Sequence, residues 1–301
     1  MEKIDLNRKG ILMAGGSGSR LMPITCSVSK QLLPVGDKPL IFYSLSILLL
    51  AGIREIAIVC QPCHRENFYR LLGDGSIFGI DIRYIVQEKP GGIAQGILLA
   101  EDFIGSDPLT LMLGDNIFYG IGLTGLLRSI PAENSGATIF AHRVSDPERF
   151  GVAEFDEAGL IRSIEEKPKV ARSNYALTGL YFYDNRALDF AKRLRPSERG
   201  ELEITDLNKR YLEIGELAVK KFGRGFAWLD TGTHQSLVAA TNFVNTIESQ
   251  QAIKIACLEE IAFDQGWISV DELECQAERF SNSSYGEYLR TLINRVQNES
   301  Y

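Results

Sequence analysis

Short apolar runs alternate with helical patterns through the first half of the chain. Strand-like runs lie at residues 10–13, 56–59, 82–86 and 109–113. Apolar residues at helical spacing lie between them, at residues 39–51, 66–72 and 93–102. Uninterrupted apolar strands are typical of a sheet that is buried on both faces. The alternation therefore predicts an α/β fold with a Rossmann-like, mostly parallel sheet flanked by helices.

The pattern changes after about residue 135. Strand patterns separated by short turns follow at residues 137–141, 152–155, 160–164 and 177–183, with a hairpin turn at 156–159. Helical patterns at 186–194 and 204–214 precede two further strands at 218–222 and 226–229. From His234 onward the pattern is helical. We therefore expect three parts: residues 1–135, a mixed β part at 136–240, and a helical tail at 241–301.

The composition is that of an ordinary globular protein. The chain has 301 residues, of which 45% are hydrophobic and 24% charged, and a formal net charge of −7. That charge argues against a nucleic-acid partner. The apolar stretch at residues 40–53 is too short and too polar to cross a membrane, and the start of the chain carries no signal-peptide pattern. We expect a cytoplasmic protein with no membrane partner.

Cys60, Cys63 and His64 match the C-x-x-C-H pattern of haem attachment, and the two cysteines also match a redox or zinc pair. Attachment of this type of haem requires export, and a zinc site would need further ligands, whereas the other three cysteines are scattered singly. We therefore interpret this segment as a variable loop, with a haem or redox protein as the alternative.

A glycine-rich segment follows the first predicted strand, at Gly15, Gly16 and Gly18. Consecutive backbone N–H groups in such a turn form an anion site. Leu21 stands where a dinucleotide fingerprint has its third glycine, and the Gly-Lys-Ser/Thr of a Walker A loop is absent. Arg20 ends the segment and Lys30 follows it, so the three features together favour binding of a triphosphate. The alternatives are a turn without a ligand and two solvated charges.

Two carboxylates follow predicted strands: Asp115 after residues 109–113, and Asp230 after 226–229. Ligands of open α/β sheets bind at the carboxyl ends of strands, and Mg²⁺ commonly uses one or two protein carboxylates. Each could instead be a turn or N-cap aspartate. Glu166 and Lys167 end another strand, where a carboxylate can accept sugar hydroxyls and a lysine can hold the sugar's phosphate; the alternative is a solvated strand end. We interpret residues 199–206 as a helix entry.

Together these motifs resemble the sugar nucleotidyltransferase family, and within it the thymidylyl branch. The resemblance covers almost the whole chain. Its motifs are AGGSGSRL at 14–21, SKQLLP at 29–34, LAGIREI at 50–56, LGDGS at 72–76, GDN at 114–116, DPERFGV at 146–152, EEKP at 165–168, TGLYFY at 178–183, RGELEITD at 199–206 and WLDTGTH at 228–234.

The resemblance implies a role for each matching position. The nucleotide side would comprise Gly15, Gly16, Gly18, Ser19, Arg20, Gln31, Gln87 and Gly92. The sugar-phosphate side would comprise Asn116, Gly151, Glu166, Lys167 and Leu177. Asp115 and Asp230 would hold Mg²⁺, and the catalytic residues would be Arg20, Lys30, Asp115 and Lys167. Residues 1–240 would then be the catalytic domain, with the nucleotide side in 1–135 and the sugar side in 136–240.

The resemblance also implies the reaction and the partners. The thymidylyl group of dTTP would pass to α-D-glucose 1-phosphate, giving dTDP-glucose and pyrophosphate for dTDP-rhamnose-type sugars of cell-surface polysaccharides. The tail would build a homotetramer and, with Tyr119, Arg224 and residues 258–262, a regulatory site for dTDP-rhamnose. Residues 88–95 depart from the family pattern, with Gly91 in place of an acid. Uridylyl or cytidylyl transfer and a non-catalytic nucleotide-sugar-binding regulator are the alternatives.

Overall fold

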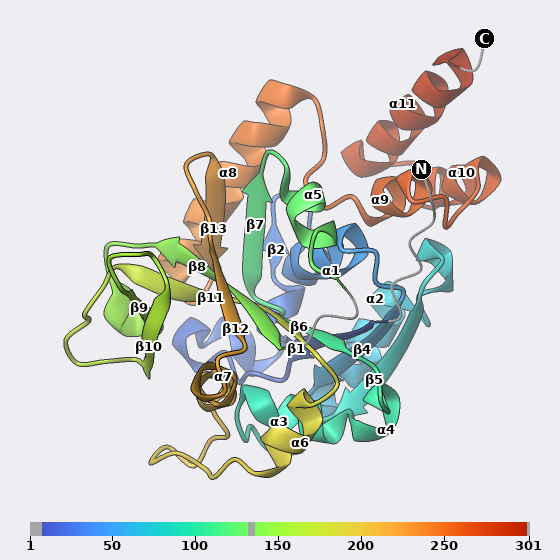
Figure 1. Ribbon diagram of the computed structural model, residues 1–301. Helices are drawn as coiled ribbons and strands as arrows, with labels where there is room; N and C mark the ends of the chain where they lie inside the picture. The colour runs from blue at the N-terminus through green and yellow to red at the C-terminus, as the bar shows by residue number, and fades with distance from the viewer. Residues whose placement is uncertain (1–7, 132–135, 300–301) are drawn as a thin grey trace.

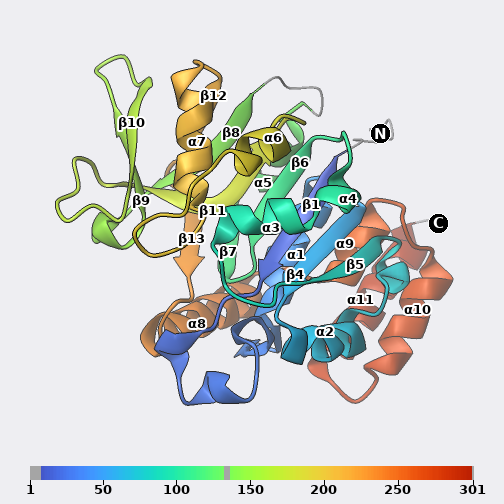
Figure 2. The ribbon, with the colours of Figure 1, turned by 90° about the horizontal axis from the view of Figure 1, so that it is seen from below.

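The computed structural model describes residues 8–131 and 136–299, and within these ranges nine strands form one central sheet. Figures 1 and 2 show this sheet with helices packed on both faces. Seven of the strands follow one another in the order β10-β9-β11-β6-β1-β4-β5. Its parallel half consists of β1 (Lys9–Ala14), β4 (Glu55–Cys60), β5 (Asp81–Val86) and β6 (Leu109–Leu113). The predicted α/β class with a largely parallel sheet is confirmed.

The other half of the sheet is mixed. The long strand β11 (Tyr175–Tyr183) runs antiparallel to β6 and to β8 (Ala137–Arg143). Beyond it lies the hairpin of β9 (Gly151–Phe155) and β10 (Ile161–Glu166). On the other side, β12 (Leu217–Lys221) runs parallel to β8. The turn between β9 and β10 lies where the sequence predicts it, with Gly159 at a φ of +82°.

Two helical layers cover the sheet. One face carries α1 (Leu40–Leu50), which is buried all round except at Leu50, and α5 (Leu123–Arg128). The opposite face carries α3, α4, α6 and α7. Their bounds are Ile93–Leu99, Glu101–Ile104, Ala187–Lys192 and Ile204–Glu213. The single helix predicted at residues 93–102 is therefore interrupted at Ala100. The remaining helix of the first half is α2 (Arg65–Leu72).

A separate two-stranded ribbon was not predicted as such. It pairs β7 (Asn116–Gly120) with β13 (Phe226–Asp230), antiparallel, with Asn116 opposite Asp230. Sequence patterns miss β7 because only two residues separate it from β6, and its partner lies more than a hundred residues away. Two further short strands, β2 (Pro34–Val35) and β3 (Lys38–Pro39), also form a small antiparallel pair.

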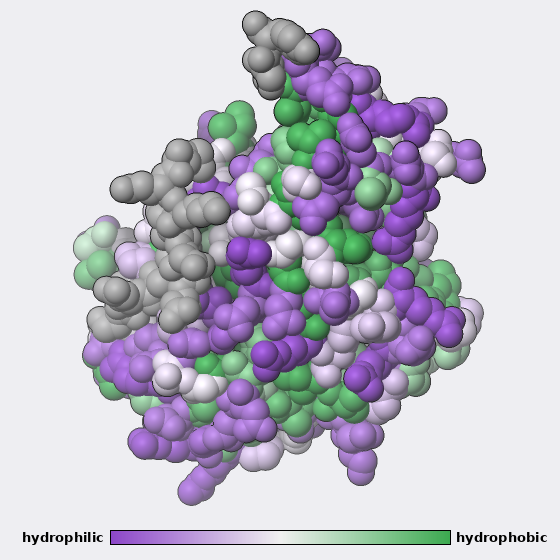
Figure 3. All heavy atoms as spheres, turned by 90° about the vertical axis from the view of Figure 1, so that its right-hand side faces the viewer, coloured by the Kyte–Doolittle hydropathy of each residue, from purple (hydrophilic) through white to green (hydrophobic). Residues whose placement is uncertain are grey.

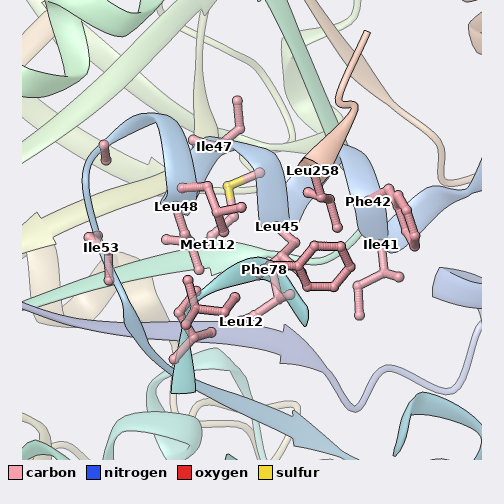
Figure 4. Close-up of a cluster of buried hydrophobic side chains, with 14 of the residues drawn as sticks. Leu12, Ile41, Phe42, Leu45, Ile47, Leu48, Ile53, Phe78, Met112 and Leu258 are labelled. Atoms are coloured by element: carbon pink, nitrogen blue, oxygen red, sulfur yellow. The ribbon is translucent and has the colours of Figure 1, made fainter. Parts of the chain in front are cut away.

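The C-terminal helices belong to the same core as the sheet. They are α8 (His234–Gln251), α9 (Leu258–Asp264), α10 (Val270–Arg279) and α11 (Ser284–Glu299). The expected boundary at residue 240 falls inside α8. Figure 4 shows Leu258 of α9 beside Ile41 and Leu45 of α1, above Leu12 of β1. Burial of these aliphatic side chains is the main force that holds the tail to the sheet.

Buried charges also hold the tail. Lys38 of β3 is 2% exposed and donates to Glu248 of α8, with Nζ and Oε1 2.9 Å apart. Glu248 also accepts from Lys254 Nζ at 3.0 Å and from the backbone N–H of Ile255 at 2.9 Å. Asp37 contacts both lysines. This network joins the β2–β3 pair to the end of α8.

The outer face of the tail is mostly polar. In Figure 3 the side of the molecule that carries α10 and α11 is covered largely by hydrophilic residues, with hydrophobic residues gathered in smaller areas between them. Across residues 8–131 and 136–299, none of the helices combines the length and the apolar character that crossing a membrane requires.

Candidate active site

The glycine-rich loop leaves the carboxyl end of β1 and stays open at its tip. Gly18 has a φ of +61°, and its carbonyl accepts from Thr25 Oγ1 at 2.8 Å. A side chain at Gly15 would collide with Gln87, since its Cβ would lie 2.1 Å from Oε1. Nothing lies within 4 Å of a Cβ at Gly16, and Ser17 and Ser19 are exposed. The loop therefore has a packed base and a free rim of backbone, as binding of phosphates requires.

Lys30 and Asp115 form an ion pair beside this loop. Lys30, 6% exposed, lies in a 3₁₀ turn, and its Nζ is 2.6 Å from Asp115 Oδ2. The other carboxylate oxygen of Asp115 accepts from Asn116 Nδ2 at 2.9 Å. Burial acts to raise the pKa of Asp115, but the Lys30 ammonium, aided by Asn116 and Arg20, lowers it overall. Asp115 is therefore held ionised and oriented.

Asp230 lies next to Asp115 because of the β7–β13 ribbon. Asp115 immediately precedes β7 and Asp230 ends β13, while Thr231 donates from both N and Oγ1 to the Asp115 carbonyl, at 3.3 and 2.8 Å. Burial, and then the Asp115 carboxylate, raise the pKa of Asp230, although Lys30, Arg20 and Arg149 oppose the rise. Because the Asp115 charge disfavours ionisation of Asp230, a cation beside both carboxylates would be stabilising.

Arg20 closes this group from the glycine loop. A Cβ at Gly232 would lie 2.9 Å from Arg20 Nη2 and 2.8 Å from Asp230 Oδ2. The guanidinium and the carboxylate therefore flank the same glycine, and only glycine leaves room for both. The structure brings Arg20, Lys30, Asp115 and Asp230 together, as the sequence predicts.

The two carboxylates fit a magnesium ion. In the described part of the chain no three or more His, Cys, Asp and Glu side chains cluster as a closed metal cage. Mg²⁺ does not need one, since it commonly takes one or two carboxylates and completes its shell with substrate phosphates and water. Asp115 and Asp230 beside an open phosphate loop supply that set of oxygen donors.

A second group of residues surrounds Gln87, at the end of β5. Gln87 is 3% exposed and donates from Nε2 to Gln95 Oε1 at 2.7 Å, which also accepts from the Gly91 N–H at 3.0 Å. Gly92 has a φ of +99°, and a Cβ there would lie 2.4 Å from the carbonyl oxygen of Leu202. Backbone bonds join Leu202 to Gly91 and to Ala94. The Gln87 amide is therefore buried between Gln95 and the base of the glycine loop, and the backbone at Gly92 lies against Leu202.

A third group lies at the β9–β10 side. A Cβ at Gly151 would contact Thr205 Oγ1, Glu166 Oε2 and Leu177 Cδ1, at 3.2 to 3.4 Å. Thr205 donates to Glu166. The three predicted sugar-side residues Gly151, Glu166 and Leu177 therefore converge on one point. Burial, and then the charges of Glu166 and Asp115, raise the pKa of Tyr181.

Lys167 adopts a left-handed backbone, with φ of 43°, directly after Glu166. Its N–H donates to the Phe150 carbonyl at 3.0 Å, and its Nζ lies 3.3 Å from Glu166 Oε1. Its side chain is about half exposed. A left-handed conformation is uncommon for residues other than glycine and recurs at functional sites. Here it turns the chain beside Gly151 and Glu166 while the ammonium stays accessible.

Some predicted residues lie behind the site rather than at its surface. Gln31 is 3% exposed, and its Oε1 accepts from Ser29 Oγ at 2.7 Å. Asn116 is 3% exposed, and its Oδ1 accepts from Trp228 Nε1 at 2.6 Å and from the Gly179 N–H at 3.1 Å. The hydrogen bonds of these side chains stabilise the segments around the site.

Sequence reasoning missed four residues, which contact the predicted ones: Gln95, Arg149, Arg199 and Thr205. Arg149 Nη2 lies 3.0 Å from Asp230 Oδ2. Arg199 Nη2 lies 2.8 Å from Glu203 Oε1 and 3.8 Å from Glu166 Oε1. The segment interpreted as a helix entry before α7 therefore also lies beside Glu166. The motifs DPERFGV and RGELEITD and the departure at residues 88–95 drew attention to these segments, and none of them indicated the contacts.

The cysteine motif adjoins the base of the glycine loop. Cys60 ends β4 and is fully buried, whereas Cys63 is exposed in the following 3₁₀ turn. Between them, Gln61 donates to the Gly15 carbonyl at 3.0 Å. The segment therefore supports the base of the glycine loop. Of the proposed regulatory residues, Tyr119 donates to Gln251 at 2.7 Å, and Arg224 is exposed between β12 and β13.

Comparison with known proteins identifies the family. The model of the nucleotidyl transferase family matches residues 9–247. Glucose-1-phosphate thymidylyltransferase of Xanthomonas campestris pv. campestris (strain B100) is 57% identical over 96% of this chain and 98% of its own length. The enzyme of the same name from Neisseria meningitidis serogroup A is 57% identical over 95% of this chain and its own full length.

Solved structures agree with these relatives. A candidate glucose-1-phosphate thymidylyltransferase from Bacillus anthracis, crystallised with sucrose, is 44% identical, covers 78% of this chain and 94% of its own, and has a TM-score of 0.73. A UDP-glucose pyrophosphorylase in complex with UDP-glucose is 25% identical over 80% of this chain and 99% of its own, with a TM-score of 0.68. The chain therefore belongs to the nucleotidyl transferase family, and its relatives group it with the glucose-1-phosphate thymidylyltransferases.

Proposed function

We propose that this enzyme transfers the thymidylyl group of dTTP to α-D-glucose 1-phosphate in a magnesium-dependent reaction that yields dTDP-glucose and pyrophosphate. The observation that carries the proposal is the position of Lys30, Asp115 and Asp230 beside the glycine loop, with Asp230 paired to Arg149, two residues before Gly151. Relatives that are 57% identical over nearly the whole chain have this activity as their name.

The nucleotide would lie on the β1 side. The free N–H groups of the loop from Gly15 to Gly18, including Gly16, and the accessible hydroxyl of Ser19 would receive the triphosphate, with Arg20 and Lys30 supplying positive charge. Gln87 and the backbone at Gly92 would read the base edge. Because Leu202 is fixed to Gly91 and Ala94, the base pocket and the start of α7 would be held together.

The sugar phosphate would lie on the β9–β10 side. Glu166 would accept hydrogen bonds from sugar hydroxyls, against the bare backbone of Gly151 and the Leu177 side chain. Lys167 would hold the phosphate. An oxygen of that phosphate forms a bond to the α-phosphorus while the bond from this phosphorus to the bridging oxygen breaks, so pyrophosphate leaves with the electron pair.

The protein's contribution to this step is position and charge. Asp115 and Asp230 would hold Mg²⁺, which when bound neutralises charge on the phosphate oxygens. Lys30 fixes the orientation of Asp115, and Asn116 and Thr231 hold that carboxylate and its backbone from the other side. No side chain needs to form a covalent bond with the substrate.

A screen of pyrophosphate release tests the proposal. The protein is incubated with glucose 1-phosphate, Mg²⁺ and one of dTTP, UTP, CTP or ATP. We expect the highest kcat/KM with dTTP. A higher value with UTP would show that the unusual segment at residues 88–95 reads uracil, and no release with any nucleotide would favour the non-catalytic regulator.

The tail supports a proposal on assembly and control. We propose that α8 to α11 form subunit contacts of a homotetramer, and that dTDP-rhamnose inhibits at a site that includes Tyr119, Arg224 and α9. The product would feed synthesis of dTDP-rhamnose-type sugars for surface polysaccharides. Sedimentation should give a mass of four chains, and millimolar dTDP-rhamnose should slow turnover; an unchanged rate would rule out the inhibitory site.

A further inference from the structure

Arg149 is a cation that neither the sequence motifs nor the proposed roles account for. It ends a 3₁₀ turn one residue before β9, and its guanidinium contacts two carboxylates. Nη1 lies 2.7 Å from Asp146 Oδ2, and Nη2 lies 3.0 Å from Asp230 Oδ2. Its side chain is 41% exposed, whereas that of Asp230 is 16% exposed. An accessible arginine therefore reaches inward to one of the two candidate metal ligands.

The segment around Arg149 also contributes to the proposed sugar-phosphate site of Gly151, Glu166 and Leu177. Gly151, two residues later, contacts the point where Glu166 and Leu177 converge, and the Phe150 carbonyl accepts from the Lys167 N–H. The guanidinium carbon lies 5.2 Å from the centre of the Phe150 ring, which packs on Trp228. Trp228 in turn donates to Asn116. Arg149 thus lies between the proposed sugar-phosphate site and the carboxylate of Asp230.

Asp115 and Asp230, the two candidate metal ligands, each form an ion pair with one basic side chain. Asp115 binds Lys30 from the nucleotide side, and Asp230 binds Arg149 from the sugar side. A divalent cation held by Asp115 and Asp230 would supply the positive charge that the lysine and the arginine supply without it. Both side chains then have charge free for another anion, and a planar guanidinium is suited to a phosphate.

We propose that Arg149 binds the phosphate of the sugar phosphate, and that it is released from Asp230 to do so when the metal binds. This inference rests on the proposed function. Arg149 would then serve the sugar phosphate as Lys30 serves dTTP. One side chain would also couple metal binding to sugar-phosphate binding.

Two binding measurements test the exchange without turnover. Mn²⁺ affinity is measured by electron paramagnetic resonance, and the Kd for glucose 1-phosphate by calorimetry, with and without Mn²⁺ and a non-hydrolysable dTTP analogue. Arg149→Ala should bind Mn²⁺ at least as tightly as wild type, because Asp230 loses a competing cation. Its Kd for glucose 1-phosphate in the ternary mixture should rise roughly 10- to 100-fold, the usual loss for a hydrogen bond to a charged group.

Arg149→Lys keeps the charge but loses the planar fork, so it should recover part of the affinity. Arg162→Ala is the matched control, since Arg162 lies on the neighbouring β10, its side chain is 71% exposed, and its nearest acid is 3.9 Å away. That variant should behave as wild type. The steady-state KM for dTTP should change little in any of the three variants.

Unchanged glucose 1-phosphate affinity in Arg149→Ala would overturn the inference. Weaker Mn²⁺ binding in that variant would also overturn it, because Arg149 would then only hold Asp230 in place. Failure of the wild-type protein to bind glucose 1-phosphate or to release pyrophosphate would instead contradict the proposed function, so the two failures are distinguishable.

Discussion

Asp115→Asn is expected to lower kcat/KM for dTTP and glucose 1-phosphate by roughly 10³-fold, with the protein still folded. The substitution preserves the shape of the side chain but removes its charge. Lys30, which is 6% exposed, loses its counterion, and the proposed magnesium site loses one of two carboxylates. The backbone bonds from Thr231 to the carbonyl of residue 115 do not depend on the carboxylate, so the β7–β13 ribbon should persist.

Pyrophosphate release measures the activity, and circular dichroism during thermal unfolding measures the fold. Asp156→Asn is the control, because Asp156 lies in the exposed turn between β9 and β10, and asparagine is well tolerated in turns. It should retain the wild-type rate. If Asp115→Asn kept more than about a tenth of the wild-type kcat/KM, the charge of Asp115 would not serve the reaction as proposed here.

Glu248→Ala is expected to lower the free energy of unfolding by about 3 kcal/mol, because it leaves buried cations without their acceptor. Glu248 is 8% exposed and accepts from Lys38, Lys254 and the Ile255 N–H. Asp37 still pairs with both lysines, so we expect the lower end of the range for a broken buried ion pair.

Urea unfolding followed by fluorescence measures this loss. Glu274→Ala on α10 removes an exposed carboxylate whose only hydrogen bond in the described structure is a 3.4 Å contact with Gln297, and it should change stability by less than about 0.5 kcal/mol. A loss below about 1 kcal/mol in Glu248→Ala would mean that water or Asp37 compensates for the missing carboxylate, and that the network does little to hold α8.

Much of the fold could be predicted because its signals are local. The apolar runs that form β1, β4 and β6 are uninterrupted, and α1 is bounded by Pro39 and by Gly52, which has a φ of +83°. The ribbon of β7 and β13 could not be predicted in this way. Its pairing depends on which distant segment meets β7, and no short-range periodicity encodes that choice.

In the site too, some features could be predicted from local sequence and others depend on the folded chain. Glycines, cations and strand-end carboxylates carry their chemistry in their residue types, and the structure gathers Arg20, Lys30, Asp115 and Asp230 as expected. Arg149 looked like any surface arginine, since nothing in DPERFGV indicates that its guanidinium reaches a carboxylate eighty-one residues later. The close approach of the Gly92 backbone to Leu202 likewise depends on two segments that only the folded chain brings together.

The shared core of sheet and tail has a consequence for synthesis of the chain. The apolar cluster that begins with Leu12 is completed by Leu258, Leu289 and Ile293. While the ribosome is still making these last residues, one side of α1 has no cover, and its aliphatic surface stays exposed to water. We therefore expect the nascent protein to depend on chaperones until α11 emerges, and chains truncated before α9 to aggregate rather than accumulate as a smaller enzyme.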